Sequence, residues 1–138
     1  ANLVILVEFF GAIALFFGVA VRWFSIPLMI TMIVAAGTVH WDNGWQAITD
    51  PSAPFANERV VEASEKLVIV KDVLQEHTNY DYITSSGSVV MLNNGIEFSV
   101  TYFIMLLALL FLGAGSYFSV DYWVERALYR EQRENSLT

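Results

Sequence analysis

Three long apolar runs constrain the fold of this chain more than any other feature. They cover residues 3–21, 24–40 and 96–118, and the only acidic side chains within them are Glu8 and Glu97. A helix needs about 20 apolar residues to cross the hydrocarbon core of a bilayer. None of the runs alternates between apolar and polar residues, as the strands of a membrane barrel do. The chain is therefore predicted to be all-α, with residues 1–138 forming a single transmembrane helix bundle of three spans.

The composition agrees with a membrane protein. Apolar residues make up 56% of the chain and charged residues 15%, whereas charged residues are about a quarter of a typical soluble domain. A chain of 138 residues is too small to bury that excess in a core of its own, and lipid can cover it. The net charge of −7 argues against binding to nucleic acid. The absence of cysteine excludes disulfides, iron–sulfur clusters and thiolate zinc sites.

Arginine near the ends of the runs predicts the orientation. Arg22 follows the first run, and Arg126, Arg130 and Arg133 follow the third. Because positively charged residues favour the cytoplasmic side, the link between the first two spans and the tail of residues 121–138 are predicted to be cytoplasmic. The loop of residues 41–95 is then extracytoplasmic. The tryptophans fall at the predicted membrane interfaces, at Trp23, Trp41, Trp45 and Trp123.

The outer loop is predicted to contain an amphipathic helix from about Asn57 to Glu76. Apolar residues recur there at steps of three and four, at Val60, Ala63, Leu67, Val70 and Leu74. Val61 and Val68 widen this stripe, and Glu62 can pair with Lys66 one turn later. The stripe, with Val60, Leu67, Val70 and Leu74, is a candidate docking face for a partner protein. It could equally pack on the returning loop, predicted to be a hairpin or irregular over Thr84–Asn94, or rest on the bilayer.

Three residues are candidates for chemistry, namely Glu8, His40 and Glu97. A carboxylate inside a membrane span is costly if it faces lipid. Glu8 shares a helical face with Gly11 and Gly18, whose small size allows another helix to approach, so Glu8 is expected to face a helix–helix seam. It is either a hydrogen-bonded structural acid or a group that handles protons or contacts a quinone.

Glu97 and His40 stand at helix ends. Glu97 opens the third run, where a carboxylate is favoured by the helix dipole, and His40 lies where the second run leaves the membrane. With the predicted orientation, both lie near the outer end of the first helix, so the two residues and Glu8 can form one polar, catalytic cluster. The structural alternatives are a helix-start acid and an interfacial histidine. A haem ligated by two histidines would need His40 and His77 to converge, which we do not expect, and no metal site is predicted.

Several stretches together resemble the DoxX family of bacterial four-helix integral membrane proteins. They are the helix end Ala35–Gly44, which contains the step Val39–His40 and the pair Asn43–Gly44, the start Asn94–Gly95–Ile96–Glu97, the glycine-rich end Gly113–Asp121, and Glu8 followed by Gly11. The chain begins, without methionine, where the family's second helix would begin, so the family's first helix is expected to be missing. The outer loop is longer than is usual in the family.

The resemblance implies a four-helix bundle in the bacterial cytoplasmic membrane with both termini in the cytoplasm. Some family members are quinone-reducing subunits linked to thiosulfate oxidation, and others accompany redox-stress or metal-responsive systems. The chain is thus predicted to be a membrane subunit of a redox or stress-response system, with quinone as the possible electron acceptor. Asp121 is expected to cap or orient a helix end.

The main alternative is a non-catalytic scaffold that docks a partner, and membrane transport is a weaker one. The sequence alone leaves open whether the chain is an enzyme. The expected partners are the lipid bilayer and either other subunits or further copies of the chain.

Overall fold

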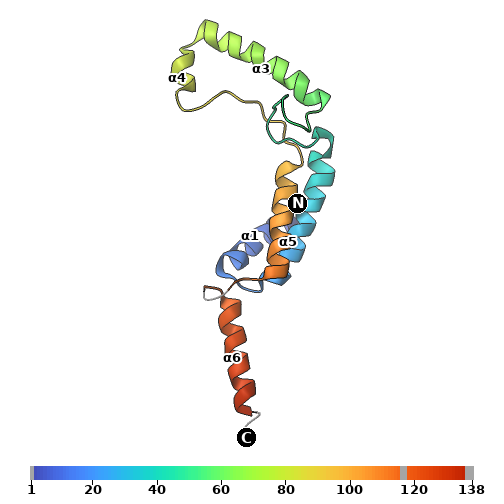
Figure 1. The fold of residues 1–138 in the computed structure, drawn as a ribbon, viewed down its shortest axis with the longest axis vertical. Helices are drawn as coiled ribbons and strands as arrows, with labels where there is room; N and C mark the ends of the chain where they lie inside the picture. Colours follow the sequence, from blue (N-terminus) through green and yellow to red (C-terminus); the bar gives the residue numbers. More distant parts are fainter. Residues whose placement is uncertain (1, 116–117, 136–138) are drawn as a thin grey trace. The chain divides into compact units, whose positions relative to one another are not determined.

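The computed structural model describes residues 2–115 and 118–135, and the ordered elements in these ranges are helices (Figure 1). In chain order they are α1 (Asn2–Phe17), α2 (Val21–Ala35), the π-helical turn η1 (Ala36–His40), the 3-10 turn η2 (Trp41–Asn43), α3 (Glu58–His77), α4 (Tyr80–Thr84), α5 (Glu97–Leu112) and α6 (Val120–Asn135). One antiparallel bridge joins Ile48 to Leu92. The predicted all-α class is confirmed.

The chain divides into two compact units. The first contains Ala1–Val34 and Val100–Thr138, and the second contains Ala35–Ser99. The first unit therefore holds most of the apolar runs, and the second holds the predicted outer loop with its two flanking helix ends. Each unit is described separately below.

The turn between the first two helices lies earlier than the sequence indicated. α1 ends at Phe17 and α2 begins at Val21, so Arg22 stands in the first turn of α2 and not in a link. Gly18 has a φ of +65°, which favours glycine. A Cβ atom at Gly18 would lie 2.5 Å from the Cβ of Ser119, so this position also requires a close approach. Pro27 lies inside α2.

Small residues bring α1 and α2 of the first unit together. Gly11 and Ala14 are buried on α1, and a Cβ added at Gly11 would lie 2.8 Å from a methyl carbon of Leu28 on α2. This is the close helix approach that the glycines predicted. The buried residues of α2 are Val21, Ser25 and Leu28, and Ser25 donates its hydroxyl to the carbonyl of Val21 at 2.7 Å.

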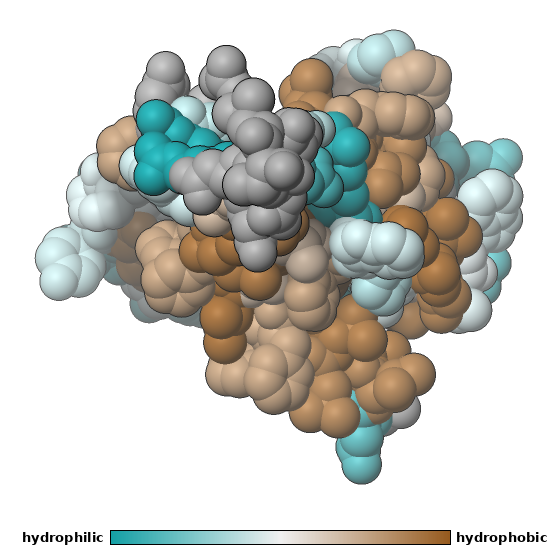
Figure 2. All heavy atoms as spheres, turned by 90° about the horizontal axis from the view of Figure 1, so that it is seen from below, coloured by the Kyte–Doolittle hydropathy of each residue, from teal (hydrophilic) through white to brown (hydrophobic). Residues whose placement is uncertain are grey.

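Large apolar side chains cover the outside of α1, α2 and α5. They include Leu3, Ile5, Phe9, Phe16, Ile30, Ile104 and Phe111, all more than half exposed. Figure 2 shows apolar residues, in brown, over much of the face that it presents. Exposed apolar surface on this scale is unfavourable in water and is typical of a surface that meets lipid or another protein.

One continuous helical stretch is long and apolar enough to cross a membrane. It runs from Val21 to Asn43, through α2, η1 and η2, and has 23 residues. α1 and α5 are also apolar but have 16 residues each, fewer than the roughly 20 that a span usually needs. One candidate span is thus present in the described part of the chain, and three crossings remain a prediction.

The third apolar run ends sooner than predicted and is followed by a helix that we had not predicted. α5 stops at Leu112, and Gly113 has a φ of +76°, which ends the helix. α6 then runs from Val120 to Asn135, and so takes up most of the predicted cytoplasmic tail. Ser116, Tyr117 and residues 136–138 lie outside the described residues.

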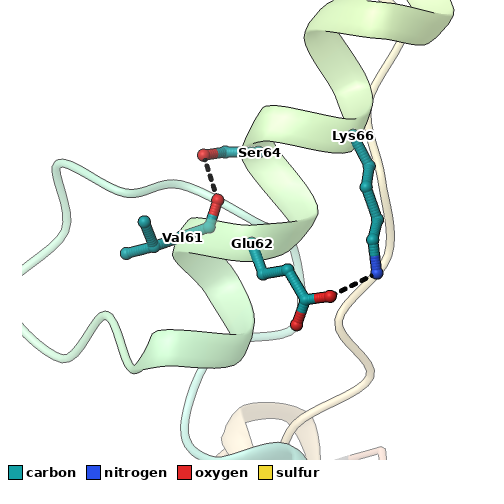
Figure 3. Close-up of polar contacts among 4 residues, drawn as sticks. All are labelled: Val61, Glu62, Ser64 and Lys66. Carbon is teal, nitrogen blue, oxygen red and sulfur yellow. Dashed lines mark hydrogen bonds and ion pairs between the residues drawn. The ribbon is translucent and has the colours of Figure 1, made fainter.

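The predicted amphipathic helix of the loop is confirmed as α3 in the second unit. Its N-cap is Asn57, whose side-chain oxygen accepts a hydrogen bond from the backbone nitrogen of Val60. Figure 3 shows the predicted pair on its polar side, where the Nζ of Lys66 lies 2.6 Å from Glu62. The return after α4 is irregular over most of its length. Near its end, the carbonyl of Met91 accepts from both the nitrogen and the hydroxyl of Thr49, and the nitrogens of Asn93 and Asn94 donate to the carbonyl of Ala47.

Candidate functional site

Glu8 lines a narrow apolar groove in the first unit. The groove has a volume of about 270 Å³ and is formed by α1, α2 and α5. Its lining consists of Glu8, Ala12, Leu15, Leu28, Met32, Tyr102, Met105, Leu106 and Leu109. The carboxyl of Glu8 and the phenol of Tyr102 are the polar side-chain groups of this lining. Such a groove suits a flat apolar molecule with one or two polar atoms at its edge.

His40 ends η1 in the second unit and is oriented by a backbone carbonyl. Its Nδ1 lies 2.9 Å from the carbonyl oxygen of Asn94. Because a carbonyl only accepts hydrogen bonds, Nδ1 must carry the proton. In the neutral ring, Nε2 is then an acceptor that is available to a proton or to a hydrogen-bond donor.

Glu97 begins α5 and is held by the segment that follows η2. Its Oε2 accepts a hydrogen bond from the backbone nitrogen of Ala47 at 2.9 Å, and its own nitrogen donates to the carbonyl of Trp45 at 3.0 Å. These bonds fit the structural interpretation of Glu97 as an acid at a helix start. A catalytic role for Glu97 stays a prediction.

A cleft of about 440 Å³ lies beside Glu97. Its walls include the aromatic pair Trp45 and Phe55, whose ring centroids are 5.9 Å apart, together with Gln46 and Asp50. Gln46 is buried, and its Nε2 donates to the backbone carbonyl of Asp50 at 2.9 Å, which fixes the orientation of the amide. Two hydrogen bonds from Ser52 to the Asp50 carboxylate hold the pKa of Asp50 below its usual value.

The segment Asn93–Gly95 connects both candidate residues of the second unit. The side-chain nitrogen of Asn93, which is buried, donates to the carbonyls of Asn43 and Gln46 at 2.7 and 2.8 Å. Gly95 lies so close to the chain that an added Cβ would be 2.5 Å from the carbonyl oxygens of Gln46 and Gly44. The sequence indicated only that Asn94 and Gly95 precede a helix. In the structure, the carbonyl of Asn94 also bonds to His40, and Gly95 packs against the backbone of Gly44 and Gln46.

The three predicted cluster residues divide between the two units. His40 and Glu97 belong to the second unit, and the segment Asn93–Gly95 with its partners holds both. Glu8 belongs to the first unit. The convergence of all three residues therefore remains a prediction, as do their catalytic roles.

Asp121 caps a helix, as expected. Its two carboxylate oxygens accept hydrogen bonds from the backbone nitrogens of Ala20 and Val21, at 2.6 and 3.1 Å, and its own nitrogen donates to the carbonyl of Gly18 at 3.0 Å. The helix that it caps is α2, although Asp121 itself stands in the first turn of α6. Sequence alone does not reveal this, because the partners are about a hundred residues apart.

The matched part of the chain is its first helices. Residues 1–41 match the model of the DoxX family. The predicted resemblance is confirmed over this segment, and DoxX proteins are associated with membranes. No curated protein and no solved structure matches the chain.

The DoxX segment contains two of the candidate residues and leaves the third outside. It covers α1, α2 and η1, and so includes Glu8 and His40, whereas Glu97 and the loop helix α3 follow it. Since the match ends at residue 41, the likeness of the later helix to the family rests on the motifs quoted above.

The proposed docking stripe on α3 is only partly accessible. Val60 is 1% exposed and belongs to the core of the second unit, while Leu67 and Leu74 are half-buried. Val70 is 42% exposed. Val61 and Val68, which widen the stripe, are also exposed, and so are Ile69 and Val73, which the stripe did not include. Docking of a partner on this helix stays a prediction.

Proposed function

We propose that this chain is a membrane subunit of a redox or stress-response system, and that it binds a quinone in the groove beside Glu8. The observation that carries the proposal is the groove itself, because its surface is apolar and Glu8 and Tyr102 are among the residues that line it. A quinone has a flat apolar ring with oxygen atoms at two edges, and this lining matches such a molecule in kind. The DoxX match over residues 1–41 includes Glu8 and supports a site in the membrane.

The residues of the groove determine which steps of quinone reduction the subunit carries out. Reduction of a quinone to a quinol takes two electrons and two protons, and the electrons come from a partner redox subunit. Glu8 passes both protons to the quinone oxygens in turn and takes up a proton from water between the two transfers, and Tyr102 donates a hydrogen bond that orients the ring. The apolar walls, including Leu28 and Leu106, exclude water from the reacting oxygens.

Quinone binding can be tested by filling the groove. Ala12→Phe places a large ring in the lining, and Ile13→Phe places the same ring at the neighbouring position of α1, which does not line the groove. The affinity for ubiquinone-1 can be measured by ligand-observed NMR with the chain in lipid nanodiscs. It should fall at least several-fold for Ala12→Phe and stay unchanged for Ile13→Phe. Equal binding by Ala12→Phe and the unsubstituted chain would contradict the site.

The proton role of Glu8 needs a separate experiment. Glu8→Gln keeps the size of the side chain but cannot donate a carboxyl proton. In the complex isolated with its native partners, this variant should still bind ubiquinone-1 and should reduce it more slowly. Unchanged turnover of ubiquinone-1 would contradict the proton role of Glu8 and would leave the proposed binding site in place.

A second candidate function is a non-catalytic one, in which α3 docks a partner. The observation in its favour is the set of exposed apolar residues on α3, including Val68, Ile69 and Val73, in a loop whose charged residues are mostly acidic. Ile69→Asp should release co-purifying proteins from the native membrane, whereas Glu65→Gln on the same helix should not. Unchanged recovery of partners with Ile69→Asp defeats this candidate.

A further inference from the structure

The helix α6 carries an apolar stripe that is largely exposed. Trp123, Val124 and Leu128 recur at steps of one and four, which places them on one face, and they are 55%, 52% and 55% exposed. Val120 lies on the same face at the start of the helix and is also exposed. The opposite side of the helix carries Tyr129. α6 is therefore amphipathic, and its apolar side is uncovered in the first unit.

Arginines border this stripe on one side. Arg126 and Arg130 are four residues apart, so they share a helical edge next to Trp123. The guanidinium carbon of Arg126 lies 5.8 Å from the centre of the Trp123 ring, which is a cation–π distance. An apolar stripe flanked by arginine and tryptophan is the pattern of helices that lie at the surface of an anionic membrane.

The start of α6 is anchored at the same end of the first unit as the beginning of α2 and the end of α5. Asp121 binds the backbone at Ala20 and Val21, as described above. A cleft of about 600 Å³ at this junction is lined by Trp23 and Leu112 on one side and by Val124 and Leu128 on the other. The apolar stripe of α6 thus adjoins the ends of the apolar helices, where a bilayer would meet water.

We propose that α6 binds anionic lipid at the membrane surface, with Trp123, Val124 and Leu128 in the acyl boundary and Arg126 and Arg130 on lipid phosphates. The inference rests on the proposed function only in that the apolar helices are taken to lie in a membrane. Lipid is favoured over a protein partner because the stripe adjoins the ends of the apolar helices and because Arg126 and Arg130 border it on the side of Trp123, while Glu125 borders the other side.

Spin labels can locate the stripe, because the chain has no cysteine of its own. Val124→Cys labels the stripe and Tyr129→Cys labels the opposite side. In nanodiscs of phosphatidylcholine and phosphatidylglycerol, the ratio of oxygen to nickel-chelate accessibility should be several-fold higher at residue 124 than at residue 129. Adding Arg126→Gln and Arg130→Gln should lower the ratio at residue 124 in these discs and change it little in pure phosphatidylcholine.

A spin label at Ile104→Cys on α5 tests the membrane location of the apolar helices separately from lipid binding by α6. If residue 104 is reached by oxygen but not by the nickel chelate, the helices lie in lipid, and equal chelate access at residues 124 and 129 then overturns the α6 inference alone. A residue 124 that neither reagent reaches also overturns it, because a protein surface then covers the stripe. Chelate access at residue 104 contradicts the membrane location of the proposed function itself.

Discussion

Asp121 stands on α6, but its replacement should destabilise the start of α2. Its carboxylate accepts from two backbone nitrogens at the start of α2, where it also faces the positive end of the helix dipole. Asp121→Asn leaves one acceptor oxygen in place of two and removes the charge. The loss should be about 0.5–2 kcal/mol, the range for N-caps. Thermal unfolding in detergent measures it.

The matched control for Asp121→Asn is Glu125→Gln, one turn later on α6. It removes the same charge from the same helix, at a residue that lines the cleft, whereas the backbone nitrogens of Ala20 and Val21 donate to Asp121. Its melting temperature should stay near that of the unsubstituted chain. Equal destabilisation by both variants would show that the net charge of α6 matters and that the cap does not.

Gly95 should tolerate no side chain. A Cβ atom there would lie 2.5 to 2.6 Å from three carbonyl oxygens, those of Gly44, Trp45 and Gln46, and backbone atoms cannot move aside as a flexible side chain does. Gly95→Ala should therefore cost about 1–3 kcal/mol, as overpacking does. Hydrogen exchange should become faster at Ala47 and Asn93, the partners in this hydrogen-bonded segment.

Gly37→Ala is the control for Gly95→Ala. An added Cβ at Gly37 meets nothing within 4 Å, and Gly37 lies in the helical turn η1. Alanine there should leave exchange unchanged or slow it, since it removes about 0.5–1 kcal/mol of the cost of glycine in a helix. Faster exchange in both variants would contradict the steric explanation.

The pair of Glu62 and Lys66 gives a prediction about pH. The hydrogen bond from Lys66, and then its positive charge, hold the pKa of Glu62 below its ordinary value. The pair therefore contributes stability at a pH above the ordinary glutamate pKa, and this contribution is lost as the pH falls through the lowered value. Lys66→Met should raise the pKa of Glu62 in an NMR titration.

At the scale of single elements, α3 combines a buried anchor with an exposed surface. Val60 is 1% exposed and Val70 is 42% exposed, although both belong to the stripe that the sequence singled out. Val60→Ala should destabilise the second unit by about 1–3 kcal/mol through the lost burial and the cavity. Val70→Ala should change its stability by less than about 0.5 kcal/mol.

Hydrogen exchange of the amides of α3 distinguishes the two variants. Faster exchange along the whole helix is expected for Val60→Ala only. This result decides which residues can serve in a docking test, since a variant at Val60 would unfold the surface that it is meant to probe. If Val70→Ala also accelerates exchange, Val70 contributes to the core of the unit and is no docking residue.

The helices differ in how well the sequence predicts them. α3 was predictable because one apolar stripe with a regular period runs along it. The ends of α1 and α5 were not, because Gly18 and Gly113 end them inside apolar runs through a positive φ, which hydropathy does not encode. α6 was missed because its arginines and its acids suggested a polar tail, although Trp123, Val124 and Leu128 already had helical spacing.

The candidate site was less predictable than the helices, because its residues bond to partners that are far away along the chain. The sequence singled out Glu8, His40 and Glu97 as polar groups inside an apolar run or at a helix end, but it contained no sign of the partners of His40 and Glu97. His40 bonds Asn94, 54 residues away, and Glu97 bonds Ala47, 50 residues away. Hydrogen bonds of this kind depend on the folded loop, and no local pattern reports them.

At the scale of the whole molecule, the chain combines an apolar unit suited to lipid with a second unit rich in backbone hydrogen bonds. The first unit exposes residues such as Phe16 and Phe111, while the second unit holds its chain by polar contacts such as those of Asn93. Most of the acidic side chains belong to the second unit, which has the composition of a segment in water. This division fits the predicted orientation, in which the loop of residues 41–95 faces outward.

That orientation can be measured directly, because any introduced cysteine is the only one in the chain. Ser88→Cys lies in the predicted outer loop and Gln132→Cys in the predicted cytoplasmic tail, and both positions are exposed. In intact cells, a membrane-impermeant maleimide should label residue 88 at once and residue 132 only after the membrane is permeabilised. The opposite result would invert the orientation. Labelling of both without permeabilisation would put the loop and the tail on the same side, which contradicts the predicted crossing of residues 96–118 between them.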